Sequence, residues 1–195
     1  MNTWTMRQAA SIWFLTVFLF LLPAVGTSAA EWENDGMAEP GKWTTGFRVG
    51  PSFMTQRSAL DTAGPALNFQ GLYGMNRWFR MGGMLEWSNH GFDRGSGSVD
   101  TVTLLPLFLE YRPGHFGAVI PYLSTGIGVN INSNSVSDSF AWRTAGGIDY
   151  AMNNWFPNLP KGLMFNTEVA WNRNHTNIGD LSAITMLFGV RYTFQ

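Results

Sequence analysis

Residues 184–194 read I-T-M-L-F-G-V-R-Y-T-F, and this stretch decides the expected fold. Large apolar groups occupy every second position, and the positions between them hold Thr185, Gly189, Arg191 and Thr193 along with Leu187. Because successive side chains of a β-strand point to opposite faces, the segment predicts a strand with one apolar face. In an exported chain, such a strand indicates a barrel whose apolar face meets lipid and whose polar face lines the interior.

The N-terminus indicates export. Arg7 precedes an apolar run over residues 9–25, and small residues from Gly26 to Ala30 follow the run. This order is typical of a secretory signal peptide cut after Ala30. The alternative is an uncleaved anchor, but the run is at the short end of the roughly 20 residues that a spanning helix needs, and Pro23 interrupts it. We expect a signal peptide over residues 1–30, a polar leader over 31–42 and a barrel over 43–195.

The composition excludes several classes of exported protein. The chain contains no cysteine, which argues against a disulfide-stabilised domain and a lipoprotein anchor. Without Arg7 the balance is 11 basic to 13 acidic groups, which argues against a nucleic-acid partner. Charged residues make up 13% of the chain, about half the usual share for a soluble domain, while aromatic residues reach 15%. Few charges and many aromatics favour a surface that faces lipid.

Eight segments show a period of two, and each has about the length that a tilted strand needs to cross a bilayer. The sequence therefore predicts an all-β fold, an eight-stranded antiparallel up-and-down transmembrane β-barrel. Polar loops would follow the odd strands on the outside, and shorter turns would follow the even strands in the periplasm, although the turn over 152–161 is long for that rule. The expected strands are 43–53, 66–75, 79–88, 101–112, 120–131, 139–151, 162–172 and 181–194.

The charges of these segments share one parity. A midplane Arg that faced lipid would cost ~2–4 kcal/mol, so we expect the charges to face a narrow lumen and pair there. Arg112 is interpreted as a strand-end charge, and the same interpretation stays open for Glu86. Leu105 is assigned to the apolar outer face, and Leu104 to an inner apolar patch with Leu72, Met84 and Phe108. The expected lumen charge network consists of Arg48, Arg80, Glu110, Arg143, Asp149, Glu168 and Arg191.

Aromatic residues gather near the ends of the expected strands. Trp43, Trp78 and Tyr111 lie near the expected periplasmic ends, and Trp142 and Trp171 lie near the outer ends. Amphipathic rings prefer the headgroup level of a bilayer, so this distribution predicts two aromatic girdles. A secreted soluble barrel of the lipocalin kind would instead bury its aromatics in the lumen.

The chain resembles the small outer-membrane barrels of the OmpA, OmpX and OmpW type. The resemblance rests on the terminal F-G-V-R-Y-T-F, on L-P-L-F-L-E-Y-R-P over residues 105–113 and on P-Y-L-S-T-G-I-G-V-N over 121–130. It implies residence in the cell outer membrane of a Gram-negative bacterium, with lipids and lipopolysaccharide as neighbours and the barrel-assembly machinery as partner during insertion. Members of the family usually end on the aromatic residue, whereas here Gln195 follows Phe194.

The chain also resembles, more weakly, the lipid A deacylases, and this resemblance implies a His-x-Ser pair on one strand. That spacing places the base and the nucleophile on one face of the strand. Here Thr176 follows His175 directly, and the residue two positions after His175 is Asn177, which is not a nucleophile. Ser182 is another candidate nucleophile.

A second alternative is OmpW-like transport of small hydrophobic molecules. His90 and His175 could form a metal pair, but they belong to strands on opposite sides of the barrel. We therefore expect a non-enzymatic barrel without catalytic residues, metal or cofactor, contributing to envelope structure or surface interaction.

Overall fold

The computed structural model describes residues 40–55, 60, 63–92, 97–134, 136–176 and 179–194. The expected signal peptide and residues 31–39 of the expected leader lie outside this part of the chain. The described part is almost entirely strand, with one short 3-10 helix, η2 (Met152–Asn154). The strands are β1 (Trp43–Met54), β2 (Ala63–Gly74), β3 (Phe79–Gly91), β4 (Ser98–Tyr111), β5 (Val119–Asn132), β6 (Ser139–Ala151), β7 (Leu163–Thr176) and β8 (Gly179–Thr193).

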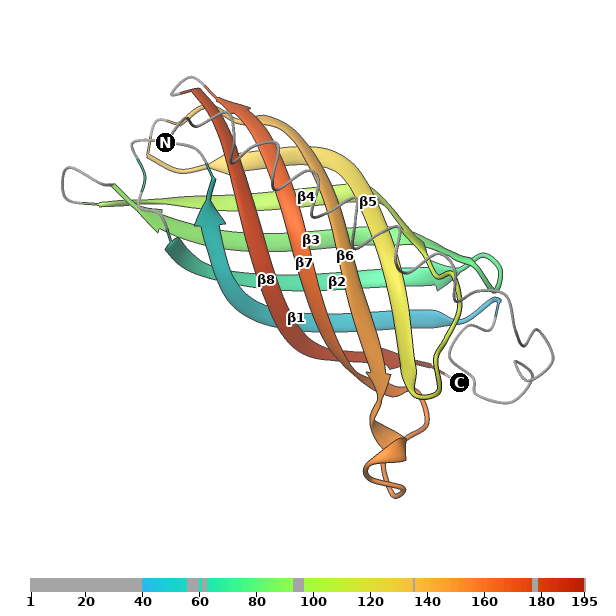
Figure 1. Cartoon of the computed structure of the whole chain (residues 1–195). Coiled ribbons are helices and arrows are strands. Elements are labelled where there is room, and N and C mark those ends of the chain that lie inside the picture. Colours follow the sequence, from blue (N-terminus) through green and yellow to red (C-terminus); the bar gives the residue numbers. More distant parts are fainter. Residues whose placement is uncertain are drawn as a thin grey trace, which may run out of the picture. The chain divides into compact units, whose positions relative to one another are not determined.

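The eight strands form a closed antiparallel barrel in sequence order (Figure 1). Each strand pairs with its neighbour in the chain, and β1 pairs with β8 through a register that places Thr44 opposite Thr193. The hydroxyls of these two residues lie 2.9 Å apart and join the first strand to the last. The predicted eight-stranded up-and-down barrel is confirmed. No helix in the described residues is long and apolar enough to cross a membrane.

Side chains alternate along the strands between the outside of the barrel and its interior. In β1, Phe47 is 52% exposed, whereas the neighbouring Arg48 is fully buried. The core therefore lies in the lumen and is largely polar, while the outer face is apolar. Exposed apolar residues on this outer face include Val49, Leu67, Phe69, Met81, Leu85, Leu107, Leu109, Ile127, Val129, Phe165, Val169, Phe188 and Val190.

A β-bulge in β4 reverses this alternation. Leu104 and Leu107 both point outward, and the pairing register with β5 shifts between them. Pro106 and Leu107 are consecutive residues and both are exposed. Pro106 has no N–H to donate to a regular ladder, which favours a bulge at this point. The assignment of Leu105 to the outer face and of Leu104 to the interior was wrong. Leu105 is fully buried in the lumen, and Leu104 is 43% exposed.

Two hairpins extend further than the sequence predicted. Strands β3 and β4 pair as far as Gly91 and Ser98, and β7 and β8 pair as far as Thr176 and Gly179. Much of the expected loops 89–100 and 173–180 is thus strand. Polar side chains support the first extension, because the Asn89 amide donates hydrogen bonds of 2.9 Å to both Ser98 and Asp100.

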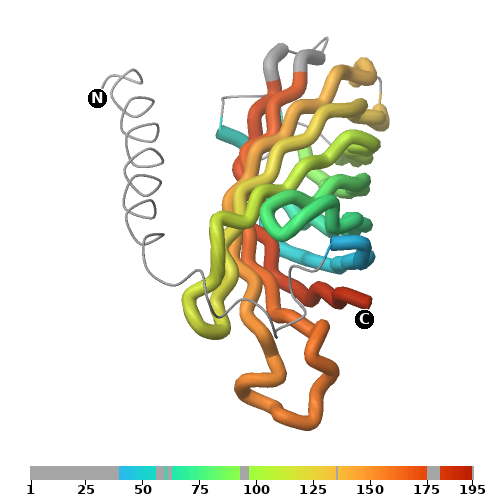
Figure 2. The backbone as a smooth tube through the Cα atoms, turned by 90° about the vertical axis from the view of Figure 1, so that its right-hand side faces the viewer, coloured from blue at the N-terminus to red at the C-terminus, as the bar shows by residue number. Residues whose placement is uncertain are grey.

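Aromatic rings pair around the end of the barrel that carries the C-terminus, which we call the C-terminal end. The β2–β3, β4–β5 and β6–β7 connections lie at this end, and the last of them projects beyond the strands (Figure 2). Toward the opposite end, the rings of Trp142 and Trp171 meet edge to face at 5.8 Å. The ring pairs at the C-terminal end are Trp43–Tyr73, Phe79–Tyr111, Tyr150–Trp155 and Tyr192–Phe194.

Candidate functional site

The lumen is crossed by ion pairs, and the first group of them lies near the middle of the barrel. We call it the central cluster, formed by Arg48, Glu86, Arg143 and Glu168. Glu168 accepts from Arg48 at 2.6 Å and from Arg143 at 2.7 Å, and Arg143 also donates to Glu86 at 3.2 Å. All four side chains are at most 3% exposed. Buried charges of this kind are tolerated because each has an opposite partner.

A second group of ion pairs lies nearer the C-terminal end. This C-terminal cluster consists of Glu110, Arg112, Asp149 and Arg191. Arg191 binds Glu110 at 2.8 Å and Asp149 at 3.0 Å, and Arg112 binds Glu110 at 2.6 Å as well as Asp149. Each arginine thus contacts the same two carboxylates, which makes a closed ring of four charges. Arg80 is buried beside this ring, opposite Glu110 in the β3–β4 register.

Tyr122 joins the two clusters. Its hydroxyl donates to Glu168 of the central cluster at 2.8 Å, and the Arg191 guanidinium of the C-terminal cluster lies 4.3 Å from its ring centroid. Asn166 makes a second link, because its amide donates to Asp149 at 2.6 Å and to the Tyr122 hydroxyl at 2.9 Å. Among the described residues the lumen holds five buried arginines and four buried carboxylates, so the interior charges nearly balance.

The structure places all seven residues of the expected network inside the barrel. Six of them make the ion pairs above, and Arg80 is buried next to these. The expected network omits Arg112, interpreted as a strand-end charge, and Glu86, for which that interpretation was left open; both are buried and paired. It also omits neutral members such as Tyr122 and Asn166. Their positions on β5 and β7 have the parity of the inward-facing residues, and this parity would have predicted that both residues lie in the lumen.

Buried apolar side chains form separate groups within the described lumen. The luminal apolar group contains Leu72, Met84, Leu105, Phe108 and Ala141. A second group, the loop-end apolar group, lies toward the end opposite the C-terminus. It contains Leu60, Val99, Val136 and Leu181, with Met54 and Phe92 packed against it.

Two arrangements bear on enzyme chemistry. The ring of His90 lies 3.3 Å from the Ser52 hydroxyl, a contact between base and hydroxyl that the sequence did not indicate. Both residues are at most 2% exposed, so an acyl chain in the membrane does not reach the hydroxyl in this arrangement.

In the suspected deacylase segment, His175 and Thr176 are paired strand residues opposite Asp180 and Gly179. Asn177 lies outside the described residues. Within the described part of the chain, no three His, Asp or Glu residues form a group that could hold a metal ion.

A closed barrel with an apolar outside and a charged inside is the arrangement of an outer-membrane protein. The family model described as "Outer membrane protein beta-barrel domain" matches residues 17–194. The chain belongs to this family. The resemblance to small outer-membrane barrels is therefore confirmed, and so is the predicted location in the outer membrane of a Gram-negative cell. There, the exposed apolar face of the barrel meets lipids and lipopolysaccharide.

Solved structures show the same fold at low sequence identity. The outer membrane protein OprG from Pseudomonas aeruginosa has a TM-score of 0.58 and 16% identity, over 83% of this outer-membrane barrel's chain and 100% of its own. Neisserial surface protein A has a TM-score of 0.53 and 14% identity, over 79% of this chain and 97% of its own. No curated protein matches the sequence. At these identities the likeness extends to architecture and not to activity.

Proposed function

We propose that the protein is a non-enzymatic outer-membrane barrel with a closed lumen, contributing to envelope structure or surface interaction. The observation that carries this proposal is that ion pairs connect opposite walls of the barrel. Arg143 on β6 binds Glu86 on β3, and Arg191 on β8 binds Glu110 on β4. An eight-stranded barrel encloses a space that side chains largely fill, and the salt bridges across it support a lumen that is closed to ions.

We infer that the C-terminal end faces the periplasm and that the barrel-assembly machinery inserts the chain. The aromatic residues Tyr192 and Phe194 at the end of the last strand support this inference, as does the resemblance to small outer-membrane barrels. The loop-end apolar group then lies toward the cell surface.

Conductance in planar lipid bilayers tests the closed lumen. Purified protein should give no large, stable single-channel currents. A Glu86→Ala, Arg143→Ala double variant removes both partners of one pair from the lumen and is expected to conduct more than the unaltered protein. Stable currents from the unaltered protein would contradict a closed lumen.

The alternative of a lipid A deacylase is tested separately. Protein reconstituted with lipid A should release no fatty acid, and His175→Ala should leave cellular lipid A unchanged. Ser52→Ala belongs in the same experiment because Ser52 contacts His90. Fatty-acid release that is lost in either folded variant would establish an esterase in place of a scaffold.

A second candidate function is the transport of small hydrophobic molecules, and the luminal apolar group is the feature that bears on it. The luminal apolar group includes Phe108, a fully buried ring that a hydrophobic ligand would have to displace. If the barrel transported such molecules, Phe108→Asp should slow their uptake in cells. We expect equal uptake by cells with the variant, the unaltered protein or no protein, because ion pairs connect opposite walls of the lumen.

A further inference from the structure

The β6–β7 connection is a folded turn and not an extended loop. It runs from Met152 through η2 to Lys161, and we call it the aromatic turn. Backbone N–H groups of Trp155 and Phe156 donate to the Met152 carbonyl at 3.1 and 2.9 Å, and the Leu159 N–H donates to the Phe156 carbonyl at 2.9 Å. These bonds fix the direction of the side chains that the turn carries.

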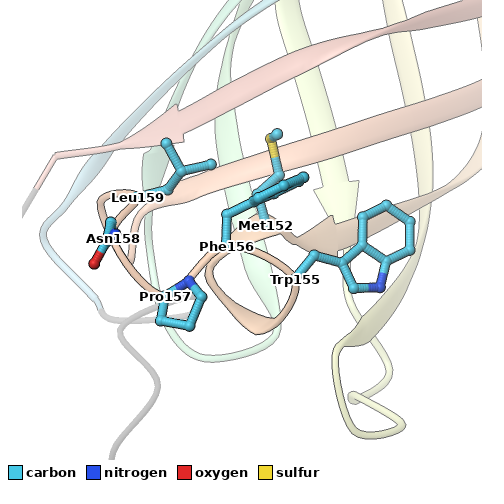
Figure 3. Close-up of a pocket in the computed structure, with 6 residues that line it drawn as sticks. All are labelled: Met152, Trp155, Phe156, Pro157, Asn158 and Leu159. Carbon is cyan, nitrogen blue, oxygen red and sulfur yellow. The ribbon is translucent and has the colours of Figure 1, made fainter.

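The aromatic turn exposes large apolar side chains at a barrel end. Trp155 is 63% exposed and Phe156 is 56% exposed. Around them lies an open hollow of about 460 Å³, in which Asn158 is the one polar residue of the lining. In Figure 3 the Met152 and Phe156 side chains project to the same side of the turn, and the Trp155 ring points away from them. The hollow is lined by Met152, Trp155, Phe156, Pro157, Asn158 and Leu159.

The turn continues the outer face of the barrel. The Trp155 ring lies against the ring of Tyr150, with 4.3 Å between the centroids. Tyr150 shares its parity with Ile148, which is exposed on the outer face, and its register partner on β7 is the exposed Phe165. Trp155 is therefore connected to the lipid-facing side of β6 and β7 and not to the lumen.

The charge of the turn fits a lipid headgroup surface. Residues 152–161 contain no acidic side chain, and their one charged residue is the exposed Lys161. Trp is enriched where a membrane meets water, and a Lys side chain reaches from apolar surroundings to headgroup phosphates. An amphipathic turn of this composition therefore matches anionic and zwitterionic phospholipid.

We propose that the aromatic turn is a membrane anchor that lies in the headgroup region of the leaflet at the C-terminal end. In the orientation inferred above, that leaflet is the inner, phospholipid one. Trp155 and Phe156 enter the boundary between headgroups and acyl chains, and Lys161 contacts phosphate. This anchor depends on the membrane location of the barrel and is independent of what the lumen does.

A single nitroxide label tests the proposal, because the chain contains no cysteine to compete for labelling. The probe is Asn158→Cys, which keeps both aromatic residues, in vesicles of phosphatidylethanolamine and phosphatidylglycerol. Ser137→Cys, at an exposed site near the opposite end, is the matched control. The ratio of collisions with oxygen to collisions with a water-soluble nickel complex reports the depth of the label. This ratio should be several-fold higher at position 158 than at 137.

The second step removes the anchor. In the Asn158→Cys background, Trp155→Ser with Phe156→Ser should lower the ratio to the value at position 137, while the heat-dependent gel shift shows that the barrel still folds. A label at 158 that is as water-exposed as the control overturns the proposal. So does a high ratio that survives both serine substitutions. A label shielded only in membranes isolated from cells would identify a protein partner and overturn the assignment to lipid.

Discussion

At the scale of single residues, Glu168 is the junction of the central cluster. Its carboxylate contacts Arg48, Arg143 and the Tyr122 hydroxyl within 2.8 Å. Removing it leaves two arginines with fewer partners in a site that water does not reach freely. Breaking a buried pair from one side costs more than the pair contributes, because the other charge stays buried.

Glu168→Ala should therefore lower the free energy of unfolding by about 3–5 kcal/mol. Asp138→Ala is the control, because Asp138 is an exposed carboxylate that accepts one hydrogen bond from the Asn132 N–H. Its effect should stay near or below about 1 kcal/mol. Urea titration of both variants in lipid vesicles measures the difference, and equal losses would count against a stabilising role of the network.

Gly147 lies where the lumen has no room. A Cβ at this position would fall on the Tyr122 hydroxyl and within 2.5 Å of the Thr167 carbonyl oxygen, so Gly147→Ala should displace the ring that joins the two clusters, strain the β6–β7 pairing and destabilise the barrel by about 1–3 kcal/mol. Gly71 is the matched strand glycine, because no atom lies within 4 Å of its added Cβ. Gly71→Ala should leave the unfolding midpoint nearly unchanged. If both substitutions shift it equally, crowding against Tyr122 and the Thr167 carbonyl is not the cause.

At the scale of elements, the period of two was enough to find all eight strands. It was not enough for β4, because a bulge adds one residue and reverses the parity beyond it. Pro106 was the available signal, since a proline inside a central strand argues for a bulge. Arg112 was left out of the predicted network because it follows the last residue of β4. Its side chain nevertheless extends into the lumen and binds Glu110 and Asp149. The sequence pattern does not indicate the direction of a side chain beyond the end of a strand.

The bulge predicts which of two adjacent leucines contacts lipid. Leu104→Cys should be labelled by a thiol reagent dissolved in the membrane, because the side chain is exposed on the outer face. Leu105→Cys should resist the reagent because that side chain is buried against Phe108 and Met84. Labelling is compared by mass spectrometry after equal times. Uninterrupted alternation from Leu107 would give the reverse result.

At the scale of the whole molecule, stability comes from closure. Every strand has two hydrogen-bonded neighbours, and the β1–β8 seam leaves no free edge for detergent to open. Protein extracted from outer membranes should therefore migrate differently before and after boiling. Identical migration of both samples would contradict a closed barrel in detergent.

The ion pairs between strands that are not neighbours also constrain how the chain is assembled. They join β1 to β7, β3 to β6 and β4 to β8, so each pair forms only after distant strands have met. A strand that enters the bilayer early carries arginines without partners, at ~2–4 kcal/mol for each one near the midplane. Strands that pair two residues out of register keep the same faces but bring the charges to the wrong partners. The polar interior is therefore expected to favour the correct register during barrel assembly, because that register pairs the buried charges.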